Sequence, residues 1–361
     1  MIASHLTTRN IKTIGVIGLI TFLSACGATT SEEVKSVSVT EDNYAYAMSD
    51  LAMQREFALG ASNTSWHHHR NIIALDKQPA PMMNRDTLYS FSIVDGGGDV
   101  VITLPETDGR YQSLHVWNSD HVTYKVFNGA GKYIIPADKT SDYFVVNVRT
   151  QIDPKDPEDV KKANSYQDQL KIEFLNGYQP KPFQVTNWNM DEFNAIHKQY
   201  VEIAHREGVM GTMGTLEHPV SLEDRNRGVA TATGLLPDSD AVYLTGQYQM
   251  KKGETLKVTY PVPAMTDLKL GFYSITIYGD DQYLHTDNGS IINNRDIKLN
   301  SDGKSFDVFY VSEEDYGKGA HDNELIVPTE TFNITMRVYM PGESVQNGDY
   351  ILPEPMVLKS K

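Results

Sequence analysis

Apolar and polar positions alternate along two long stretches of the chain, one in its first half and one in its last third. Alternation with a period of two, rich in β-branched and aromatic residues, is typical of strands that bury one face. In the first stretch it predicts strands at Leu88–Val94, Val100–Leu104, Tyr111–Trp117, Thr123–Phe127 and Tyr143–Val148. In the second it predicts strands at Val242–Gln249, Thr255–Tyr260, Phe272–Tyr278, Phe306–Val311 and Phe332–Tyr339. Glycine-rich turns separate the strands, as in antiparallel sandwiches and jelly rolls.

Helical spacing of apolar residues occurs outside these stretches. Ser38 and Glu41 have the spacing of a capping box, which predicts a helix that continues to about Ala58. A charged helix is predicted over Pro157–Gln169, and a stronger one over Met190–Glu207, with Asn189 as its N-cap and Gly208 as its stop.

These elements, in a chain of 361 residues, fit two domains. We expect a mainly β protein with added helices (α+β), built from two β-sandwich or jelly-roll-like domains over residues 38–210 and 211–361. The segments 101–117 and 258–278 also share one order of features: a strand, a proline, a loop and a Gly-x-Tyr strand. Two related sandwiches would explain this likeness, and so would chance among β motifs.

The N-terminus carries the signature of secretion. Arg9 and Lys12 precede an apolar run, Ile14–Leu23, which is too short for a permanent membrane helix and is typical of a signal peptide. The run ends in Leu-Ser-Ala-Cys26, which resembles the lipobox of bacterial lipoproteins. That resemblance implies a signal peptide over residues 1–25, with acyl chains such as palmitate on Cys26, and a tether over residues 26–37. The alternative is an ordinary cleaved signal with an incidental cysteine.

Charge and cysteine content narrow the partners and the location. The chain has 32 Lys and Arg against 47 Asp and Glu, and removing residues 1–25 takes two basic residues with it, which changes the net charge from −15 to −17. Such an acidic chain is a poor partner for nucleic acid, and we expect it to reach a membrane through its lipid anchor only. Gly27 follows the cysteine instead of the aspartate that retains enteric-type lipoproteins, so we expect attachment to the outer membrane, facing the periplasm or the surface. The single cysteine, Cys26, excludes an intrachain disulfide and a cysteine-based zinc site.

Several strings along the chain resemble a family of unknown function. Asn84-Arg-Asp-Thr-Leu-Tyr-Ser90, Val101-Ile-Thr-Leu-Pro105 and Gly109-Arg-Tyr111 are similar to the domain of unknown function 1254. Gly271-Phe-Tyr-Ser-Ile-Thr-Ile-Tyr278, Asp302-Gly303 and Met336-Arg-Val-Tyr-Met-Pro341 are similar to its C-terminal partner, the domain of unknown function 1214. The resemblance implies two jelly-roll-like domains. The family has tryptophans where this chain has Tyr273 and Glu324. If those tryptophans line a ligand surface, that surface differs here.

Polar residues within these strings are the candidates for ligand binding. They are Asn84, Asp86, Tyr89, Arg110, Tyr111, Arg337 and Tyr339. A guanidinium beside a carboxylate and phenols at strand ends can orient an anionic or polyhydroxylated ligand. The alternative is structural, because Asn and Asp before a strand often stabilise turns and Arg110 could pair with Asp86.

Metal binding is a further expectation. In the run His67-His68-His69, an extended backbone would place His67 and His69 on one face, where they could bind a divalent metal. No other cofactor is predicted. The sequence contains no Gly-x-Ser-x-Gly elbow, P-loop, Rossmann glycine pattern or His-Glu-x-x-His motif.

These features lead to three hypotheses of function. We expect a lipid-anchored protein of the cell envelope that binds a small polar or glycan-like ligand in a cleft. The first alternative is an envelope hydrolase of esters or glycosides that uses either a metal at His67 and His69 or the carboxylates of Asp86 and Asp120. The second is a structural envelope protein that assembles through its sheet edges as a homo-oligomer.

Overall fold

The computed structural model describes residues 35–358. Residues Ser36–Lys361 form one compact unit, and this unit contains both groups of predicted strands. The predicted signal peptide and Cys26 lie outside the described residues. In the described part of the chain, no helix is both long and apolar enough to cross a membrane.

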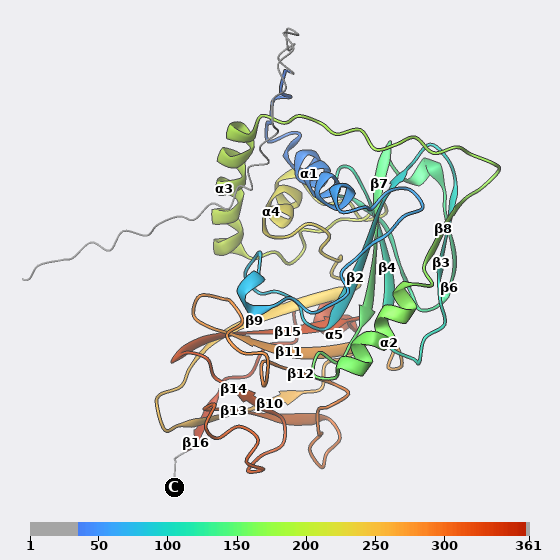
Figure 1. The fold of residues 1–361 in the computed structure, drawn as a ribbon. Coiled ribbons are helices and arrows are strands. Elements are labelled where there is room, and N and C mark those ends of the chain that lie inside the picture. The colour runs from blue at the N-terminus through green and yellow to red at the C-terminus, as the bar shows by residue number, and fades with distance from the viewer. Residues whose placement is uncertain (1–34, 359–361) are drawn as a thin grey trace, which may run out of the picture. The chain divides into compact units, whose positions relative to one another are not determined.

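The first group of strands forms a sandwich of two antiparallel sheets (Figure 1). One sheet has the order β1-β2-β7-β4-β5, with strands at His67–His68, Thr87–Asp95, Tyr143–Gln151, Gln112–Asn118 and Thr123–Asn128. The other has the order β6-β3-β8, with strands at Gly131–Ile135, Val100–Leu104 and Lys171–Phe174. The sequence prediction placed β2, β3, β4, β5 and β7 within three residues at each end, and it missed the others.

Apolar side chains fill the space between these two sheets. The core contains Val94, Leu114, Val116, Phe144, Val146 and Val148 from the larger sheet and Val100, Ile102 and Leu104 from the smaller one. Because side chains alternate along a strand, the intervening residues of β4 and β7 point away from this core. That other face of the larger sheet carries several polar side chains, and it positions the candidate site.

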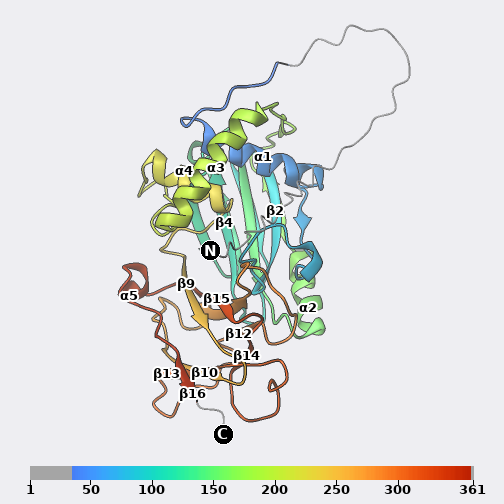
Figure 2. The same ribbon diagram turned by 90° about the vertical axis from the view of Figure 1, so that its left-hand side faces the viewer.

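Helices cover that other face of the larger sheet. They are α1 (Tyr44–Ala58), α3 (Met190–Glu207) and α4 (Leu222–Thr231), which pack against one another and lie together in Figures 1 and 2. The limits of α3 agree with the sequence prediction, including Asn189 at its N-cap and Gly208 at its end. The helix α4 follows the predicted boundary at residue 210 but packs with α1 and α3.

The predicted capping box at Ser38 and Glu41 is wrong. The helix begins at Tyr44, and its N-cap residue is Asn43. The hydroxyl of Ser38 instead donates a 2.8 Å hydrogen bond to the carboxylate of Glu192 at the start of α3. A hydrogen bond to a residue more than 150 positions away in the chain has therefore replaced the local capping bond that the spacing suggested.

The second group of strands forms another sandwich. One sheet has the order β12-β11-β15-β9, with strands at Ile291–Asn293, Phe272–Tyr278, Thr331–Tyr339 and Ala241–Gln249. The other has the order β14-β13-β10-β16, with strands at Glu324–Ile326, Ser305–Val311, Thr255–Pro261 and Met356–Leu358. Its core includes Val258, Ile275, Phe306, Phe332 and Ile334. The remaining elements are α2 (Pro157–Gln167), α5 (Glu343–Gln346), and the short 3₁₀ turns Leu75–Lys77 and Ala137–Lys139.

The two segments with a shared order of features occupy equivalent places. Segment 101–117 passes from β3, the central strand of the smaller sheet, into β4 of the larger one. Segment 258–278 passes likewise from β10 to β11, between the two sheets of the second sandwich. Each of the two similar segments therefore crosses from one sheet to the other within its own sandwich.

Candidate functional site

Six of the seven predicted ligand residues meet at the junction between the two sandwiches. Asn84, Asp86 and Tyr89 lie at the start of β2, and Tyr111 directly precedes β4. They contact β11 and β15 of the second sandwich, where Arg337 and Tyr339 are located. The sequence prediction had drawn these residues from strings far apart in the chain, and the fold brings them together.

The side chain of Asn84 forms hydrogen bonds with both domains at the junction. Its amide nitrogen donates hydrogen bonds to the hydroxyls of Tyr89, at 2.9 Å, and Tyr339, at 3.1 Å. Its amide oxygen accepts a 2.7 Å hydrogen bond from the backbone N–H of Asp86. Asn84 therefore makes the turn contact that its position before a strand suggested, and it also links the two domains.

Asp86 is buried, with 1% of its surface exposed. One carboxylate oxygen accepts a 2.6 Å hydrogen bond from Ser274 of β11. Within the described residues, the other oxygen, Oδ1, has no hydrogen-bond partner. Burial raises the pKa of Asp86 to about 6, against the opposing effects of the Arg337 charge and the Ser274 hydrogen bond.

Arg337 provides positive charge beside this carboxyl group. Its guanidinium donates to the hydroxyl of Thr276 at 3.0 Å, and to the backbone oxygen of Met82 and the hydroxyl of Tyr278 at 2.8 Å each. Neighbouring tyrosines and Asp86 raise the pKa of Arg337 against the effect of burial, so the group is charged at any ordinary pH.

Arg110 lies apart from this junction and has a structural environment. Its guanidinium forms ion pairs with Asp108, at 2.8 Å, and with Asp159 of α2, at 2.6 Å. It also donates to the backbone oxygen of Gln151 at 2.9 Å. The pairing of Arg110 with Asp86 that the sequence left open does not occur, because two other carboxylates surround the guanidinium.

The sequence prediction missed a polar patch on the larger sheet next to the junction. In the register of the sheet, Arg149 of β7 lies opposite Tyr89 on one side and Ser113 on the other. One row further, Asn147 lies between Phe91 and His115. Asn147 and Arg149 interrupt the apolar run of β7 at alternate positions, and this was the signal that could have revealed them.

Buried polar atoms without partners are concentrated in this region. They are Asp86 Oδ1, Tyr111 Oη, Ser113 Oγ, His115 Nδ1, Trp117 Nε1, Asn147 Oδ1 and Arg149 Nη1, none of which has a hydrogen-bond partner in the part of the chain that the structure describes. We call this set the unpaired polar cluster. A buried polar group without a partner costs about 1–3 kcal/mol. Seven such groups in one region therefore point to a ligand or water molecules that would satisfy them.

A loop between α4 and β9 covers part of this cluster. The backbone oxygen of Gly234 accepts a hydrogen bond from Arg149, and its N–H donates to His121 at 2.7 Å. Gly234 has a φ of +74°, and an added Cβ would lie 3.0 Å from the ring of Trp117. Both the backbone conformation and the close approach therefore favour glycine here.

A small hollow lies beside this loop, next to Tyr243 of β9. It has a volume of about 20 Å³ and is lined by Leu235, Leu236, Asp238, Val242, Tyr243 and three residues from 209–213. That is room for about one water molecule. Tyr243 lies opposite Arg337 in the sheet, so the hollow adjoins the junction. Access for anything larger requires the covering loop to move.

A second polar group lies at the edge of the same sheet. Glu56 of α1, His67 of β1 and His69 place a carboxylate oxygen and two ring nitrogens within 4.8 Å of one another. The two histidine rings lie on one side of the extended segment, with centroids 4.6 Å apart, as the sequence predicted. Burial by itself raises the pKa of Glu56, but its contacts with His69, His67 and Arg55 outweigh burial and lower this pKa to about 2. The sequence prediction did not include Glu56.

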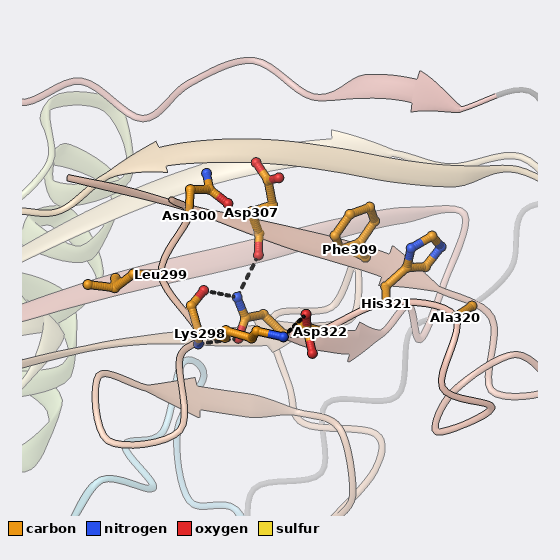
Figure 3. Close-up of a pocket in the computed structure, with 9 residues that line it drawn as sticks. Lys298, Leu299, Asn300, Asp307, Phe309, Ala320, His321 and Asp322 are labelled. Atoms are coloured by element: carbon orange, nitrogen blue, oxygen red, sulfur yellow. Dashed lines mark hydrogen bonds and ion pairs between the residues drawn. The ribbon is translucent and has the colours of Figure 1, made fainter. Parts of the chain in front are cut away.

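A second and larger hollow lies in the second sandwich, away from the predicted ligand residues. Figure 3 shows it between the strand that carries Asp307 and Phe309 and the loop at His321. Its polar side chains are paired: Lys298 with Asp322 at 2.9 Å, and the Asn323 amide with two backbone oxygens. His321 stacks on Phe309, with ring centroids 4.0 Å apart. Its paired side chains make it a weaker candidate than the junction.

The position where the family has tryptophan and this chain has Tyr273 lies in the core. The Tyr273 ring is buried and stacks on Phe306, with centroids 5.5 Å apart. The hydroxyl of its neighbour Ser274 donates the hydrogen bond to Asp86. The departure at Tyr273 therefore changes the packing of the second sandwich and not the junction.

Comparison with known families agrees with the predicted pairing. Residues 62–173 match the family DUF1254, described as a protein of unknown function. Residues 237–343 match the family DUF1214, which has the same description. A search of the curated proteins finds no match.

Solved structures share the fold. The crystal structure of a protein from Vibrio parahaemolyticus is 20% identical, with a TM-score of 0.65, and the match covers 88% of this chain and 98% of that one. An uncharacterised protein from Burkholderia cenocepacia is 13% identical, with a TM-score of 0.51 and 88% of each chain covered. At these identities the likeness extends to the fold alone.

Proposed function

Because this chain belongs to the proteins that join DUF1254 to DUF1214, we propose that it uses this domain pairing to bind a small polar, glycan-like ligand at the junction. We further propose that it does so as a lipid-anchored protein of the bacterial cell envelope. The observation that carries the ligand proposal is the unpaired polar cluster.

The chemistry of the cluster favours a ligand with several hydroxyl groups. Arg149 and Trp117 offer N–H donors, and Asp86 and Asn147 offer oxygen acceptors. A hydroxyl group both donates and accepts, so a polyhydroxylated molecule can satisfy both kinds of atom. A hydrocarbon ligand would leave all of them unpaired.

The charges of the junction favour a neutral or singly anionic ligand. Arg149 and Arg337 bring two positive charges, against the carboxyl groups of Asp86 and of Asp240, which interacts with Arg149. The guanidinium of Arg149 lies 5.5 Å from the ring centre of Tyr89. This cation–π contact helps to hold the guanidinium over the sheet. A neutral sugar fits this balance, and a sugar acid would place its carboxylate near Arg149.

Ligand-induced thermal stabilisation of the full chain in detergent tests the proposal. The probes are neutral hexoses, hexuronic acids and amino sugars, each at millimolar concentration. We expect at least one to raise the melting temperature of the wild type, and the Arg149→Met variant to lose this response. The matched control, Arg206→Met on the exposed end of α3, should keep it. A response that survives in Arg149→Met would contradict binding at the junction.

The anchor is a separate part of the proposal. It is supported by Cys26 being the only cysteine and standing at the end of a signal-like segment. Expression of the full chain in a Gram-negative host with a labelled palmitate precursor should label the wild type in the membrane fraction. Cys26→Ser should abolish the label. A wild-type chain without label would contradict lipidation.

A second candidate function is metal-dependent hydrolysis of esters or glycosides. It is favoured by Glu56, His67 and His69, which place three metal-ligand atoms together at the sheet edge. Turnover of an ester and glycoside panel, with and without added Zn²⁺, tests it. Hydrolysis that depends on the metal and is lost in His69→Gln would support an enzyme, and no turnover across the panel would contradict it.

A further inference from the structure

We propose that Glu56, His67 and His69 form a binding site for one divalent transition-metal ion, with Zn²⁺ as the reference ion. This site goes beyond the proposed ligand binding at the junction, and it stands or falls independently of that function.

The fold brings the three side chains together from two elements. β1 pairs antiparallel with β2, with His67 opposite Phe91, and the N–H of His69 donates to the backbone oxygen of Tyr89 at 2.8 Å. These contacts hold residues 67–69 extended, so that the first and third side chains share a face. Glu56 projects toward that face from the last turn of α1.

The distances approach those of a metal site. The Oε2 atom of Glu56 lies 2.7 Å from Nδ1 of His67 and 3.7 Å from Nε2 of His69. With metal–ligand distances of about 2.0–2.2 Å, neighbouring ligand atoms of a tetrahedral site lie roughly 3.3 Å apart. Shifts of about half an ångström would bring both Glu56 distances to this value, and the two histidine nitrogens, which lie within 4.8 Å of each other, would have to adjust by side-chain rotation as well.

The donor set selects the class of metal. Two imidazole nitrogens and one carboxylate oxygen suit zinc and neighbouring transition metals, whereas calcium and magnesium prefer oxygen ligands alone. Three protein ligands leave at least one coordination position open, as in zinc sites that bind water. The His69 side chain is 44% exposed, so solvent reaches this ligand.

The surroundings of the carboxylate fix its orientation. Glu56 is 4% exposed, and Arg55 donates to its other oxygen, Oε1, at 3.0 Å. This leaves Oε2 directed at the two histidines. Hydrogen bonds to a ligating carboxylate orient it and tune the metal, and the Arg55 contact would have this role.

The middle histidine provides an internal contrast. His68 points to the opposite face, and its Nδ1 lies 2.8 Å from the hydroxyl of Ser90. Its pKa is lowered to about 4, chiefly by burial, so it is neutral near pH 7. Because it faces away from Glu56, we assign the metal to the outer two histidines.

The alternative is a simple hydrogen bond between Glu56 and His67 that holds α1 on the sheet. A hydrogen-bonded pair and a metal site differ in what His69 contributes. In the structural alternative, His69 adds little, because its ring nitrogen lies 3.7 Å from the carboxylate and is exposed. In a metal site, His69 is an essential ligand.

Calorimetric titration of the metal-stripped full chain in detergent with Zn²⁺ tests the proposal. We expect one equivalent bound by the wild type, and an affinity at least about tenfold weaker in His69→Gln, since even the loss of a supporting contact costs 10–100-fold. The matched control is His205→Gln, an exposed histidine on α3, which should bind as the wild type does. Because His69 is exposed, the metal-free variant should keep the melting temperature of the wild type.

Co²⁺ supplies a readout that does not depend on heat. We expect visible absorption bands of nitrogen- and oxygen-coordinated Co²⁺ in the wild type and in His205→Gln, and their loss in both His69→Gln and Glu56→Gln. The absence of stoichiometric Zn²⁺ binding by the wild type would overturn the proposal. Equal affinity in wild type and His69→Gln would overturn it as well.

Discussion

The hydroxyl of Ser274 donates a 2.6 Å hydrogen bond to the carboxylate of Asp86, across 188 residues of chain and from one β sandwich to the other. Asp86 precedes β2 of the first sandwich, and Ser274 lies in β11 of the second. Beside this contact, Asn84 bonds to Tyr339, and Arg337 bonds to the backbone of Met82. The two domains thus meet through a network of buried polar groups, beside an apolar cluster in which Tyr111 packs against Phe272.

The titration of Asp86 should make this junction sensitive to pH. Burial raises the pKa of Asp86 from 3.8 to about 6, so the folded protein holds this proton more tightly than the unfolded chain does. The resulting stabilisation, on the order of 3 kcal/mol, is fully present below about pH 4 and is lost as the pH rises through 6. The side chain of Asp86→Asn cannot ionise, so the stability of this variant should not fall in this way as the pH rises.

Urea unfolding of both proteins at pH 4 and pH 7 measures the effect. The free energy of unfolding of Asp86→Asn, relative to the wild type, should increase by up to about 3 kcal/mol between the two pH values. The comparison cancels the titration of groups that both proteins share. A difference that does not change with pH would contradict a raised pKa at Asp86.

Removing the hydroxyl of Tyr111 should leave the unliganded protein at least as stable. This residue is 1% exposed, and its hydroxyl has no hydrogen-bond partner among the described residues. Tyr111→Phe removes a buried polar atom without breaking a bond, so the free energy of unfolding should stay equal or rise by up to about 1 kcal/mol.

Tyr278 provides the matched control for that substitution. Its hydroxyl donates to the backbone oxygen of Met83 at 2.9 Å and accepts from Arg337 at 2.8 Å. Tyr278→Phe should therefore cost about 1–3 kcal/mol in chemical denaturation. If Tyr111→Phe costs as much as Tyr278→Phe, the Tyr111 hydroxyl is already satisfied and the unpaired polar cluster is smaller than we describe.

Arg110 should behave as a stabilising residue and not as a ligand residue. Its side chain is fully buried between Asp108 and Asp159. Arg110→Met leaves Asp159 without its counter-charge, while Asp108 keeps its 2.9 Å ion pair with Lys162, and should lower the free energy of unfolding by about 3 kcal/mol. Any sugar that stabilises the wild type should raise the melting temperature of this variant by a similar amount. Loss of that response in a folded Arg110→Met protein would assign Arg110 to the ligand site.

The sequence predicted most of the sheet framework, because alternating apolar residues report directly on burial. It predicted Phe272–Tyr278 and Met190–Glu207 with their observed limits. Short strands such as Ile291–Asn293 and Glu324–Ile326 carry too few residues to show a period, and they were missed. The capping box at Ser38 failed because Glu192, a distant residue, binds the same hydroxyl.

The candidate site could be predicted only in part. Asn84, Asp86 and Tyr339 stood in recognisable strings, and their convergence followed from the fold. Arg149 and Glu56 stood in no such string. Arg149 belongs to the site because β7 lies between β2 and β4, and Glu56 because α1 ends beside β1. Neighbours of this kind depend on the order of strands in a sheet, which the pattern of a single strand does not contain.

The central claim is that a small polar molecule satisfies the unpaired polar cluster. A high-resolution crystal structure of the full chain, purified from its native source without added sugars, tests it most directly. We predict electron density for one small molecule within hydrogen-bond distance of Arg149 Nη1 and at least one of Tyr111 Oη and Asp86 Oδ1. Density for water molecules alone, or protein atoms packed against all three, would contradict the claim.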